Sequence, residues 1–338
     1  MRPLSSIIIL NYNSIKYTLK CVESVLDSDS FGEYEIIIID NNSRGDDYSV
    51  LNKKFGNLNN VSVFKTGKNL GFAGGCNFGV KKARGDYVVL LNNDTLVDKG
   101  WLSELVKAIS KDKSIGVVGS VEKGWWDGVT LNLIGYHISN VFDDKKQSLY
   151  AKGSSLIFRR ELVDVPFDPD YFLYGEDVYL CWRLRLKGYK ILIEPKSEII
   201  HFGSVSSGGE ESYTFIYYGE RGRILNLLIF YEFKSLLKIM PMLILGIVIR
   251  GAASILKYDK NLIIRTKARL WIIRNIKLIL RKRKDIQKER KVSDDEIFRY
   301  MTCKNIRGNS FVSRLINKIS YLYCYLMGIK TKEFYDEY

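Results

Sequence analysis

The sequence predicts an α/β fold in which a mostly parallel sheet is flanked by helices and followed by a basic helical extension. Short apolar runs rich in Ile and Val recur along the first 120 residues, and stretches with helical spacing separate them. Such alternation is typical of βαβ units, whose strands are parallel and buried on both faces. The excess of basic residues lies entirely in the last third of the chain, which sets that third apart.

The expected elements follow from these runs in chain order. A first strand covers residues 5–10, and a helix follows over 14–26, where apolar residues recur at helical spacing after a candidate N-cap at Asn13 or Ser14. Further strands are expected at 35–40, 61–64, 86–91, 116–121 and 191–194. Further helices are expected at 47–55, 73–83, 99–109 and 176–187.

Cysteine usage and the N-terminal residues bear on the compartment. The chain of 338 residues holds five scattered cysteines, none in a C-x-x-C pair. This argues against a disulfide framework or a zinc site and favours a reducing compartment. The short apolar run at the N-terminus is expected to be a strand and not a signal peptide.

Polar clusters follow three of the expected strands. They are Asn11 to Asn13, Asp40 to Ser43, and Asn92 to Asp94. In an open parallel sheet, ligands bind beyond the carboxyl ends of the strands, so the three clusters would meet at one edge. The alternative interpretation is that each cluster caps the helix that follows it.

Two aspartates and one histidine are candidates for binding a metal or a nucleotide at that edge. Asp94, flanked by amides, suits Mg²⁺ or Mn²⁺ that arrives with a diphosphate, because these ions prefer hard oxygen ligands. Asp40 could accept a hydrogen bond from a uracil or thymine base, or from a ribose hydroxyl. His201 could contact the metal or the diphosphate. The alternatives are a helix cap at Asp94, an Asx-turn at Asp40 and a structural histidine.

Two further stretches point to a ligand. The sequence NLGFAGGCNFG (69–79) is glycine-rich and opens a helix, where backbone can approach a phosphate closely; a tight turn before a packed helix is the alternative. Glu176 and Asp177 begin another helix after an aromatic stretch. They could simply favour the helix dipole, or one of them could act as a general base beside apolar walls.

Taken in order, LNYN, IIIIDNNS, NLGFAGGCNFG, GDYVVLLNNDT, FLYGEDVYLCWRLRLKGYK and IIHFGS strongly resemble the family-2 inverting glycosyltransferases of the rhamnosyltransferase-like group. The resemblance covers about residues 5 to 205. It implies a GT-A fold, with a Rossmann-like sheet, and a nucleotide-sugar donor. It matches Asn92-Asn93-Asp94 to the D-x-D motif and Glu176-Asp177 to the acidic pair, with Asp177 as the base. The residues then expected to bind the nucleotide sugar are Asn11, Asn13, Asp40, Asn42, Asn69, Gly71, Gly74, Asn92 and Asn93, and those expected to bind metal are Asp94 and His201.

The chain departs from the family pattern at three points. Tyr179 stands where many relatives carry a second aspartate of an E-D-x-D motif, the D-x-D motif keeps a single acid, and the Q-x-x-R-W signature of processive synthases is absent. Tyr179 is expected to alter acceptor or local polar contacts while leaving Asp177 in place, and the single acid is expected to give modest metal affinity. The absence of the Q-x-x-R-W signature favours addition of one sugar or few.

The last third differs in charge from the rest. Residues 1–220 hold 26 Lys/Arg and 28 Asp/Glu, whereas residues 221–338 hold 26 and 10. Residues 224–249 are largely apolar, with an uncharged core of 11 residues that is short for a membrane span. Residues 265–291 carry twelve Lys/Arg around an apolar stripe, as in helices that lie in a membrane interface. Residues 310–328 form a third apolar, Tyr-rich candidate. The alternative is a helical extension packed on the catalytic half.

The sequence thus predicts a domain over 1–220 and a membrane-associating extension over 221–338. The expected protein is a metal-dependent inverting glycosyltransferase, peripheral to the cytoplasmic face of a membrane with an anionic surface. It would use a UDP- or dTDP-linked sugar, Mn²⁺ or Mg²⁺, and a glycan or lipid-linked glycan acceptor. No nucleic-acid partner is expected, since stacking platforms need aromatics and the basic stretch is interleaved with Ile and Leu. The competing hypotheses are a nucleotidyltransferase on a similar scaffold and an inactive basic protein that binds a membrane or nucleic acid.

Overall fold

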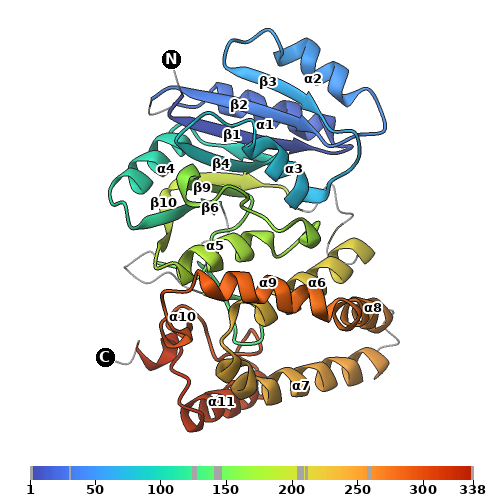
Figure 1. Cartoon of the computed structure of the whole chain (residues 1–338), viewed down its shortest axis with the longest axis vertical. Coiled ribbons are helices and arrows are strands. Elements are labelled where there is room, and N and C mark those ends of the chain that lie inside the picture. Colours follow the sequence, from blue (N-terminus) through green and yellow to red (C-terminus); the bar gives the residue numbers. More distant parts are fainter. Residues whose placement is uncertain are drawn as a thin grey trace.

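The centre of the molecule is a single mixed sheet. The computed structural model describes residues 3–29, 32–123, 128–140, 147–203, 209, 212–256 and 261–335. Its eight-stranded sheet has the order β3-β2-β1-β4-β9-β6-β10-β5 (Figure 1). The strands are β1 (Ser5–Asn11), β2 (Tyr34–Asp40), β3 (Val61–Lys65), β4 (Tyr87–Asn92), β5 (Thr95–Val97), β6 (Ile115–Glu122), β9 (Ser155–Arg159) and β10 (Lys190–His201), and a separate hairpin joins β7 (Gly128–Leu131) to β8 (His137–Asn140).

The register of the strands confirms the predicted mostly parallel sheet. β1 pairs in parallel with both β2 and β4, and β2 pairs in parallel with β3. β9 runs antiparallel between β4 and β6, and β5 runs antiparallel beside β10. Asn11 lies opposite Asp40, and Leu10 lies opposite Asn92. The polar ends of these strands therefore meet at one edge, as the sequence predicts.

Alternating residues of each strand face two different layers of helices. Ile7 and Ile9 of β1 pack into one apolar cluster with α1 (Ile15–Leu26), α2 (Asp47–Phe55) and α4 (Trp101–Ser110). Ile8 points into a second cluster with α3 (Gly71–Val80) and α5 (Glu176–Leu186). The alternation follows from the two-residue period of a strand. It places α5 on the face where the C-terminal helices lie.

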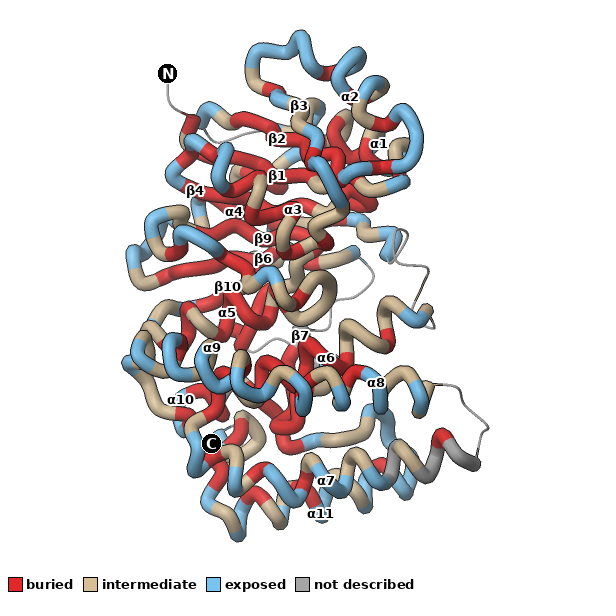
Figure 2. Tube along the Cα trace, turned by 45° about the vertical axis from the view of Figure 1, so that its right-hand side comes forward, coloured by how far each residue is buried: buried red, intermediate tan, exposed pale blue. Residues whose placement is uncertain are grey.

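The C-terminal helices pack directly on α5. Trp182 of α5 stacks on Phe230 at the end of α6 (Tyr213–Phe230), with ring centroids 5.3 Å apart and planes at 14°. One apolar cluster includes residues of α5 and of α6, and Figure 2 shows buried residues in both helices. The predicted domain boundary at 220 lies inside α6, and the division into two domains stays a prediction. These helices are α6 (Tyr213–Phe230), α7 (Phe233–Leu256), α8 (Asn261–Arg274), α9 (Ile276–Lys288), α10 (Asp294–Phe298) and α11 (Phe311–Leu326); three short 3-10 turns are Arg160–Leu162, Pro169–Tyr171 and Lys332–Phe334.

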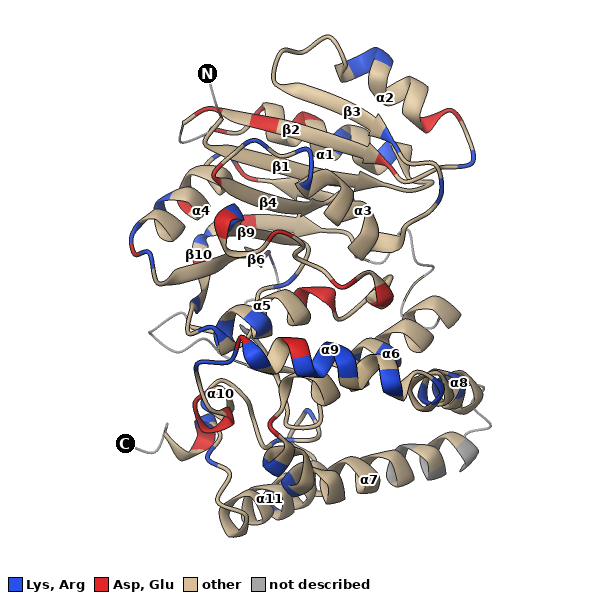
Figure 3. Ribbon diagram, viewed as in Figure 1, with Lys and Arg blue, Asp and Glu red and all other residues tan. Residues whose placement is uncertain are grey.

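The basic extension is organised differently from the simplest expectation. The stretch 224–249 is divided between α6 and α7, and 265–291 is divided between α8 and α9 at Asn275. Lys282 forms ion pairs with Asp168 and Asp170, and Arg283 donates hydrogen bonds to two backbone carbonyls near the end of α6. Part of the basic excess on α9 therefore ties the extension to the catalytic half (Figure 3). In the described ranges, no helix is both long and apolar enough to cross a membrane.

Candidate functional site

Asn11 and Asp40 are the core of a buried polar cluster at the sheet edge. Both side chains are fully buried. The Asn11 amide donates to Asp40 Oδ1 at 3.0 Å and to Asp47 Oδ2 at 2.9 Å, and its carbonyl oxygen accepts from Thr18 Oγ1 at 2.6 Å. Asn11 thus orients Asp40, and a role in nucleotide binding stays a prediction for both residues.

Asn13 and Asn42 lie in the two loops beside this cluster. Both adopt left-handed backbone conformations, with φ of 51° and 63°, a region that asparagine tolerates better than most residues. The backbone N–H of Asn13 donates to Ser43 Oγ at 2.9 Å, and the side-chain Oδ1 of Asn13 accepts from the backbone N–H of Arg44 at 2.9 Å. These bonds close the β1 and β2 loops against each other, and Asn42 remains exposed beside them.

The glycine-rich segment approaches the protein's own backbone. Gly71 has φ +69°, and a Cβ there would lie 2.3 Å from the Phe172 carbonyl oxygen. A Cβ at Gly74 would lie 2.8 Å from Leu70 Cβ. Asn69 Oδ1 accepts from the Gly71 amide at 2.8 Å and from Asn41 Nδ2 at 3.0 Å. Close packing explains these glycines, so their contact with a phosphate remains a prediction.

The end of β4 brings Asn92, Asp94 and His201 together. His201 Nε2 lies 3.2 Å from Asp94 Oδ1 and 3.4 Å from Asn92 Nδ2, because β5 and β10 pair His201 with Thr95. Asn92 Oδ1 is buried and has no hydrogen-bond partner. Asn93 instead donates to Ser14 Oγ at 2.6 Å, which ties the strand end to α1. Three of the predicted metal and donor residues thus lie together, whereas Asn93 is occupied by structural bonds.

Glu122 completes this pocket, although the sequence analysis did not identify it. It ends β6, and its carboxylate accepts from His201 Nδ1 at 3.1 Å, from Ser154 Oγ at 2.8 Å and from Lys152 Nζ at 2.6 Å. Burial alone would lower the pKa of His201, but the hydrogen bonds to Asp94 and Glu122 raise this pKa to about 9. Burial would raise the pKa of Glu122, but His201 and Lys152 lower it to about 2. A cationic imidazole therefore lies between two carboxylates at this edge.

Glu176 and Asp177 begin α5 in different surroundings. Burial, with the charge of Asp177 added to it, raises the pKa of Glu176 to about 8, and its Oε2 has no hydrogen-bond partner. Asp177 Oδ2 accepts from the Gly153 amide at 3.1 Å, and its Oδ1 accepts from the Val178 amide at 2.7 Å. A carboxylate held by two backbone N–H groups has one fixed orientation. Asp177 thus has the geometry of a positioned base.

The loop before α5 is held in an unusual conformation. Phe172, Tyr174 and Gly175 have φ of 62°, 66° and 91°. Left-handed backbone at non-glycine residues costs energy and persists only where surrounding structure enforces it. Asn226 of α6 supplies part of this restraint, because its Nδ2 donates to the Gly175 carbonyl at 3.0 Å. Helix α6 therefore fixes the start of α5.

A cavity of about 650 Å³ is lined by Asn92, Glu176, Asp177 and His201 of the predicted site residues, whereas the other predicted residues, Asp40 and Asp94 included, are not part of its lining. Its walls come from the ends of β4, β6 and β10, the start of α5, and the helices α6 and α8. Arg265 of α8 and Arg307, which precedes α11, bring positive charge to it, and His137 hydrogen-bonds to Tyr150 in the wall. The members that carry chemistry are Asn92, Glu122, His137, Tyr150, Lys152, Glu176, Asp177, His201, Glu220, Arg223, Arg265 and Arg307.

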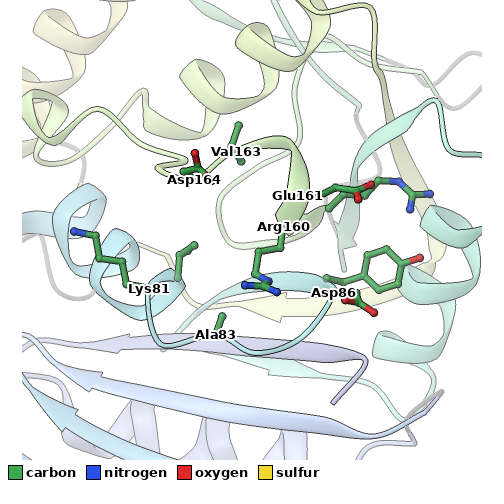
Figure 4. A pocket seen from close by; sticks show the side chains of 10 residues that line it. Lys81, Ala83, Asp86, Arg160, Glu161, Val163 and Asp164 are labelled. Carbon is green, nitrogen blue, oxygen red and sulfur yellow. The ribbon is translucent and has the colours of Figure 1, made fainter. Parts of the chain in front are cut away.

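A second cavity, of about 760 Å³, lies at the other end of the strands (Figure 4). It opens beside the loop that precedes β4, which includes Ala83 and Asp86. Arg160 and Glu161 bring charges of both signs, and Arg160 Nε donates to the Gly85 carbonyl at 2.6 Å. None of the predicted site residues lines it. The cavity at the carboxyl edge is therefore the candidate site.

Comparison with known proteins identifies a family. Residues 6–165 match the model of "Glycosyl transferase family 2". The chain is 26% identical over 235 residues to uncharacterized protein y4gI of Sinorhizobium fredii. This alignment covers 62% of this chain and 26% of that protein. It is 26% identical over 120 residues to glycosyltransferase GlyG of Streptococcus pneumoniae, covering 36% of this chain and 40% of that protein. The chain thus spans between a quarter and two fifths of these curated relatives.

Solved structures share the fold. A structure of GalNAc-T7 with UDP, GalNAc and Mn²⁺ superposes with a TM-score of 0.56 and 19% identity, covering 66% of this chain and 48% of that one. The mannosyltransferase PcManGT of Pyrobaculum calidifontis, in complex with GDP-Man and Mn²⁺, superposes with a TM-score of 0.54 and 14% identity, covering 86% of each chain. The predicted fold class is therefore confirmed.

Proposed function

This chain belongs to glycosyl transferase family 2 and has a GT-A fold, and from this premise we propose that it transfers a sugar from a nucleotide diphosphate donor, with inversion, to a hydroxyl group of a glycan. One observation carries the proposal most directly. Asp177, a carboxylate oriented by two backbone N–H groups, lines the same cavity as Asn92 and His201, which contact each other at the strand edge. A base and a diphosphate-binding edge in one cavity are what sugar transfer requires.

Asp177 is the proposed general base. It removes the proton of the acceptor hydroxyl while that oxygen forms a bond to the anomeric carbon of the donor. The bond between that carbon and the diphosphate breaks at the same time, and the nucleoside diphosphate leaves with the electron pair. Attack from the face opposite the leaving group inverts the anomeric centre. Holding both substrates in line in one cavity supplies much of the rate.

The donor lies along the edge formed by β1, β2 and β4 in this proposal. Asp40, which is buried and oriented by Asn11, binds the base or ribose. Asn13, Asn42, Asn69, Gly71, Gly74 and Asn93 contribute to the walls around the donor. The two structural neighbours, which contain UDP or GDP-Man and share the fold, support a nucleotide-linked donor.

The residues at the edge fit a divalent cation. Asp94 offers an oxygen ligand, and His201 offers a nitrogen ligand once a metal displaces its proton, since a metal binds only the neutral imidazole. The buried Asn92 Oδ1 beside them lacks a partner. Among the described residues, no three or more His, Cys, Asp or Glu side chains gather as a metal site; Mg²⁺ commonly takes one or two carboxylates and completes its shell with water and phosphate. Asp94 and His201 would hold Mn²⁺ or Mg²⁺, which when bound stabilises the negative charge of the leaving diphosphate. The Mn²⁺ in both neighbouring structures supports this.

The acceptor is proposed to be a glycan carried by a lipid, with the enzyme bound peripherally to an anionic membrane from the cytoplasmic side. The net positive charge of residues 221–338 supports such a location, because each Lys or Arg close to an anionic surface contributes about 1 kcal/mol. Part of this charge also reaches the active-site cavity through Arg265 and Arg307.

Donor binding and transfer test the proposal in sequence. Thermal unfolding is followed with UDP, dTDP and GDP, and with their sugar conjugates, in the presence of Mn²⁺, Mg²⁺ or EDTA. A ligand at 100 times its Kd adds about 2.7 kcal/mol of stability, so one base and one metal should stand out. The selected donor is then assayed by release of its nucleoside diphosphate in the presence of glycan acceptors. The absence of any metal-dependent stabilisation by these nucleotides would contradict the proposed donor site.

A further inference from the structure

Helix α11 is folded with its polar face inward and its apolar face outward. The residues that it buries are Ser313, Ser320 and Cys324. Its large apolar residues lie on the opposite side and are between 48% and 73% exposed; they are Phe311, Leu315, Ile319, Leu322 and Leu326. A surface helix of a globular protein has the reverse arrangement. Packing within the protein therefore does not explain the apolar stripe.

Helix α7 carries a matching stripe. Ile239 and Met242 on its inner side belong to the core, and Ser235 is buried with them. The outer side repeats apolar residues at helical spacing, each between 41% and 70% exposed; they are Phe233, Leu237, Met240, Ile244 and Val248. This part of α7 is thus apolar on both sides, which in water is unusual unless something covers the outer one.

The two stripes lie on neighbouring helices. Tyr323 of α11 donates a hydrogen bond to the Lys238 carbonyl of α7 at 2.7 Å. Figures 1 and 2 both show the two helices side by side at the end of the molecule opposite β1, β2 and β3. The ten apolar residues just named constitute what we call the α7–α11 face. Scattered exposed apolar residues are normal, but ten exposed large apolar residues gathered on two neighbouring helices indicate an interaction site.

The charges around the α7–α11 face indicate what covers it. Residues 233–248 and 311–326 contain Lys234, Lys238, Arg314 and Lys318 and no Asp or Glu. Long basic side chains beside an apolar stripe can extend toward lipid headgroups while their aliphatic parts stay in the apolar layer. A second copy of the same face would bring the same positive charge and would be repelled. An anionic lipid surface complements both the apolar residues and the charge.

We propose that the α7–α11 face docks on an anionic lipid bilayer, with both helices lying in the interface. The purpose of this docking rests on the proposed function, because docking would bring the enzyme to an acceptor carried by a lipid. Arg307, which lines the active-site cavity, lies four residues before Phe311 of the face. Docking through α11 therefore holds a wall of the cavity close to the membrane.

The proposal selects two of the three membrane-associating stretches that the sequence predicts, which are 224–249, 265–291 and 310–328. The stretch 265–291 is the rival surface, and its apolar stripe on α8 and α9 is exposed at Leu270, Ile273 and Leu280. Lys282 and Arg283, however, are engaged with the protein itself. The two surfaces make different predictions for substitutions, so experiment can separate them.

The test measures binding of the full chain to vesicles of phosphatidylcholine with or without phosphatidylglycerol, by co-sedimentation. One variant combines Leu237→Gln, Ile244→Gln, Ile319→Gln and Leu322→Gln. Its matched control combines Ile263→Gln, Leu270→Gln, Ile273→Gln and Leu280→Gln on α8 and α9, which are 42% to 66% exposed. A third variant combines Lys234→Gln, Lys238→Gln, Arg314→Gln and Lys318→Gln. All substituted apolar positions are exposed, so each variant should fold, and circular dichroism checks this.

The wild type should bind vesicles with phosphatidylglycerol more tightly than vesicles without it. The first variant should bind at least about 100-fold more weakly, because each fully buried large apolar side chain accounts for roughly tenfold or more. The control should bind nearly as the wild type does. The charge variant should lose its preference for phosphatidylglycerol, by about fivefold for each residue close to the surface.

Three results would overturn the proposal. They are unchanged binding of the first variant, loss of binding in the control instead, and a wild type that ignores vesicles but forms a dimer that the first variant abolishes. The last result would make the face an interface between copies. Nucleotide-sugar transfer to a soluble acceptor analogue is measured on the same samples. An inactive wild type that still binds vesicles would defeat the proposed function and leave the α7–α11 face standing.

Discussion

Gly222 is the residue through which α6 controls the position of the proposed base. A Cβ at this position would lie 2.2 Å from the Tyr174 carbonyl oxygen, in the strained loop that leads to α5. The substitution Gly222→Ala therefore pushes backbone against backbone. Gly219→Ala is the matched control, because it lies one turn earlier in the same helix and its Cβ would meet nothing within 4 Å.

The size of the effect follows from these distances. The loop must retreat by about 1 Å to reach an ordinary contact distance from the new Cβ. Overpacking of this kind costs about 1–3 kcal/mol. Replacing glycine by alanine inside a helix gains about 1 kcal/mol, and this gain is common to both variants. Gly222→Ala should thus be less stable than Gly219→Ala by about 1–3 kcal/mol in the free energy of unfolding.

The same displacement should affect transfer. A shift of about 1 Å in a positioned group can cost on the order of 100-fold in rate, and the loop at Tyr174 leads directly into Glu176 and Asp177. We expect kcat for release of the nucleoside diphosphate to fall by about that factor in Gly222→Ala, with the KM of the donor little changed. Gly219 also lines the cavity, but a methyl group there would meet no protein atom within 4 Å, so Gly219→Ala should keep a kcat near that of the wild type. Equal unfolding free energies and equal kcat values in the two variants would refute the reasoning.

Three further predictions concern the carboxylates of the site. Asp177→Asn should lower kcat by about 10²–10⁴-fold and leave donor binding intact, since a base acts in the transition state; near-normal turnover together with an inactive Glu176→Gln would reassign the base to Glu176. Asp94→Asn should remove the metal-dependent part of nucleotide binding in calorimetry, whereas Asp164→Asn in the opposite cavity should not, and equal metal dependence in both would reject Asp94 as a ligand. Glu176, whose pKa rises from 4.5 to about 8 on folding, binds its proton more tightly in the folded protein, so stability should fall as pH rises through this window. Glu176→Gln should flatten that fall in urea unfolding at several pH values, and an unchanged slope would show that another group causes it.

The sheet was predictable because its strands are local and strongly apolar. The Ile-rich runs at 5–10 and 35–40 predicted β1 and β2 to within a residue or two. β9, by contrast, was not identified. Its pairing with β4 joins residues such as Tyr87 and Arg159, far apart in sequence, and such a partner leaves no periodic signal in either segment. The pattern of apolar runs and helices predicts the parallel strands. An antiparallel strand inserted between two of them can be recognised only in the folded sheet.

The site shows the same division. The ends of β1, β2 and β4 were found because parallel strands end at a common edge, and the structure brings Asn11 next to Asp40 and Asp94 next to His201. Glu122 ends β6 in the same way, so the rule that found the others could have found it. Arg265 and Arg307 could not have been found so, because they reach the cavity only through the packing of the extension.

The acidic pair illustrates what only three dimensions can separate. In the sequence, Glu176 and Asp177 are two adjacent carboxylic acids at a helix start, and either could be the base. Successive residues of a helix point about 100° apart, so their surroundings differ although both reach the cavity. Glu176 has one oxygen without a partner and a pKa raised by burial, which favours its neutral form. The oxygens of Asp177 accept from two backbone N–H groups, bonds that a carboxylate makes well. Because neighbouring carboxyl groups in different environments can take different roles, the oriented Asp177 suits the base, and Glu176, whose neutral form burial favours, suits a neighbour that limits negative charge beside the acceptor.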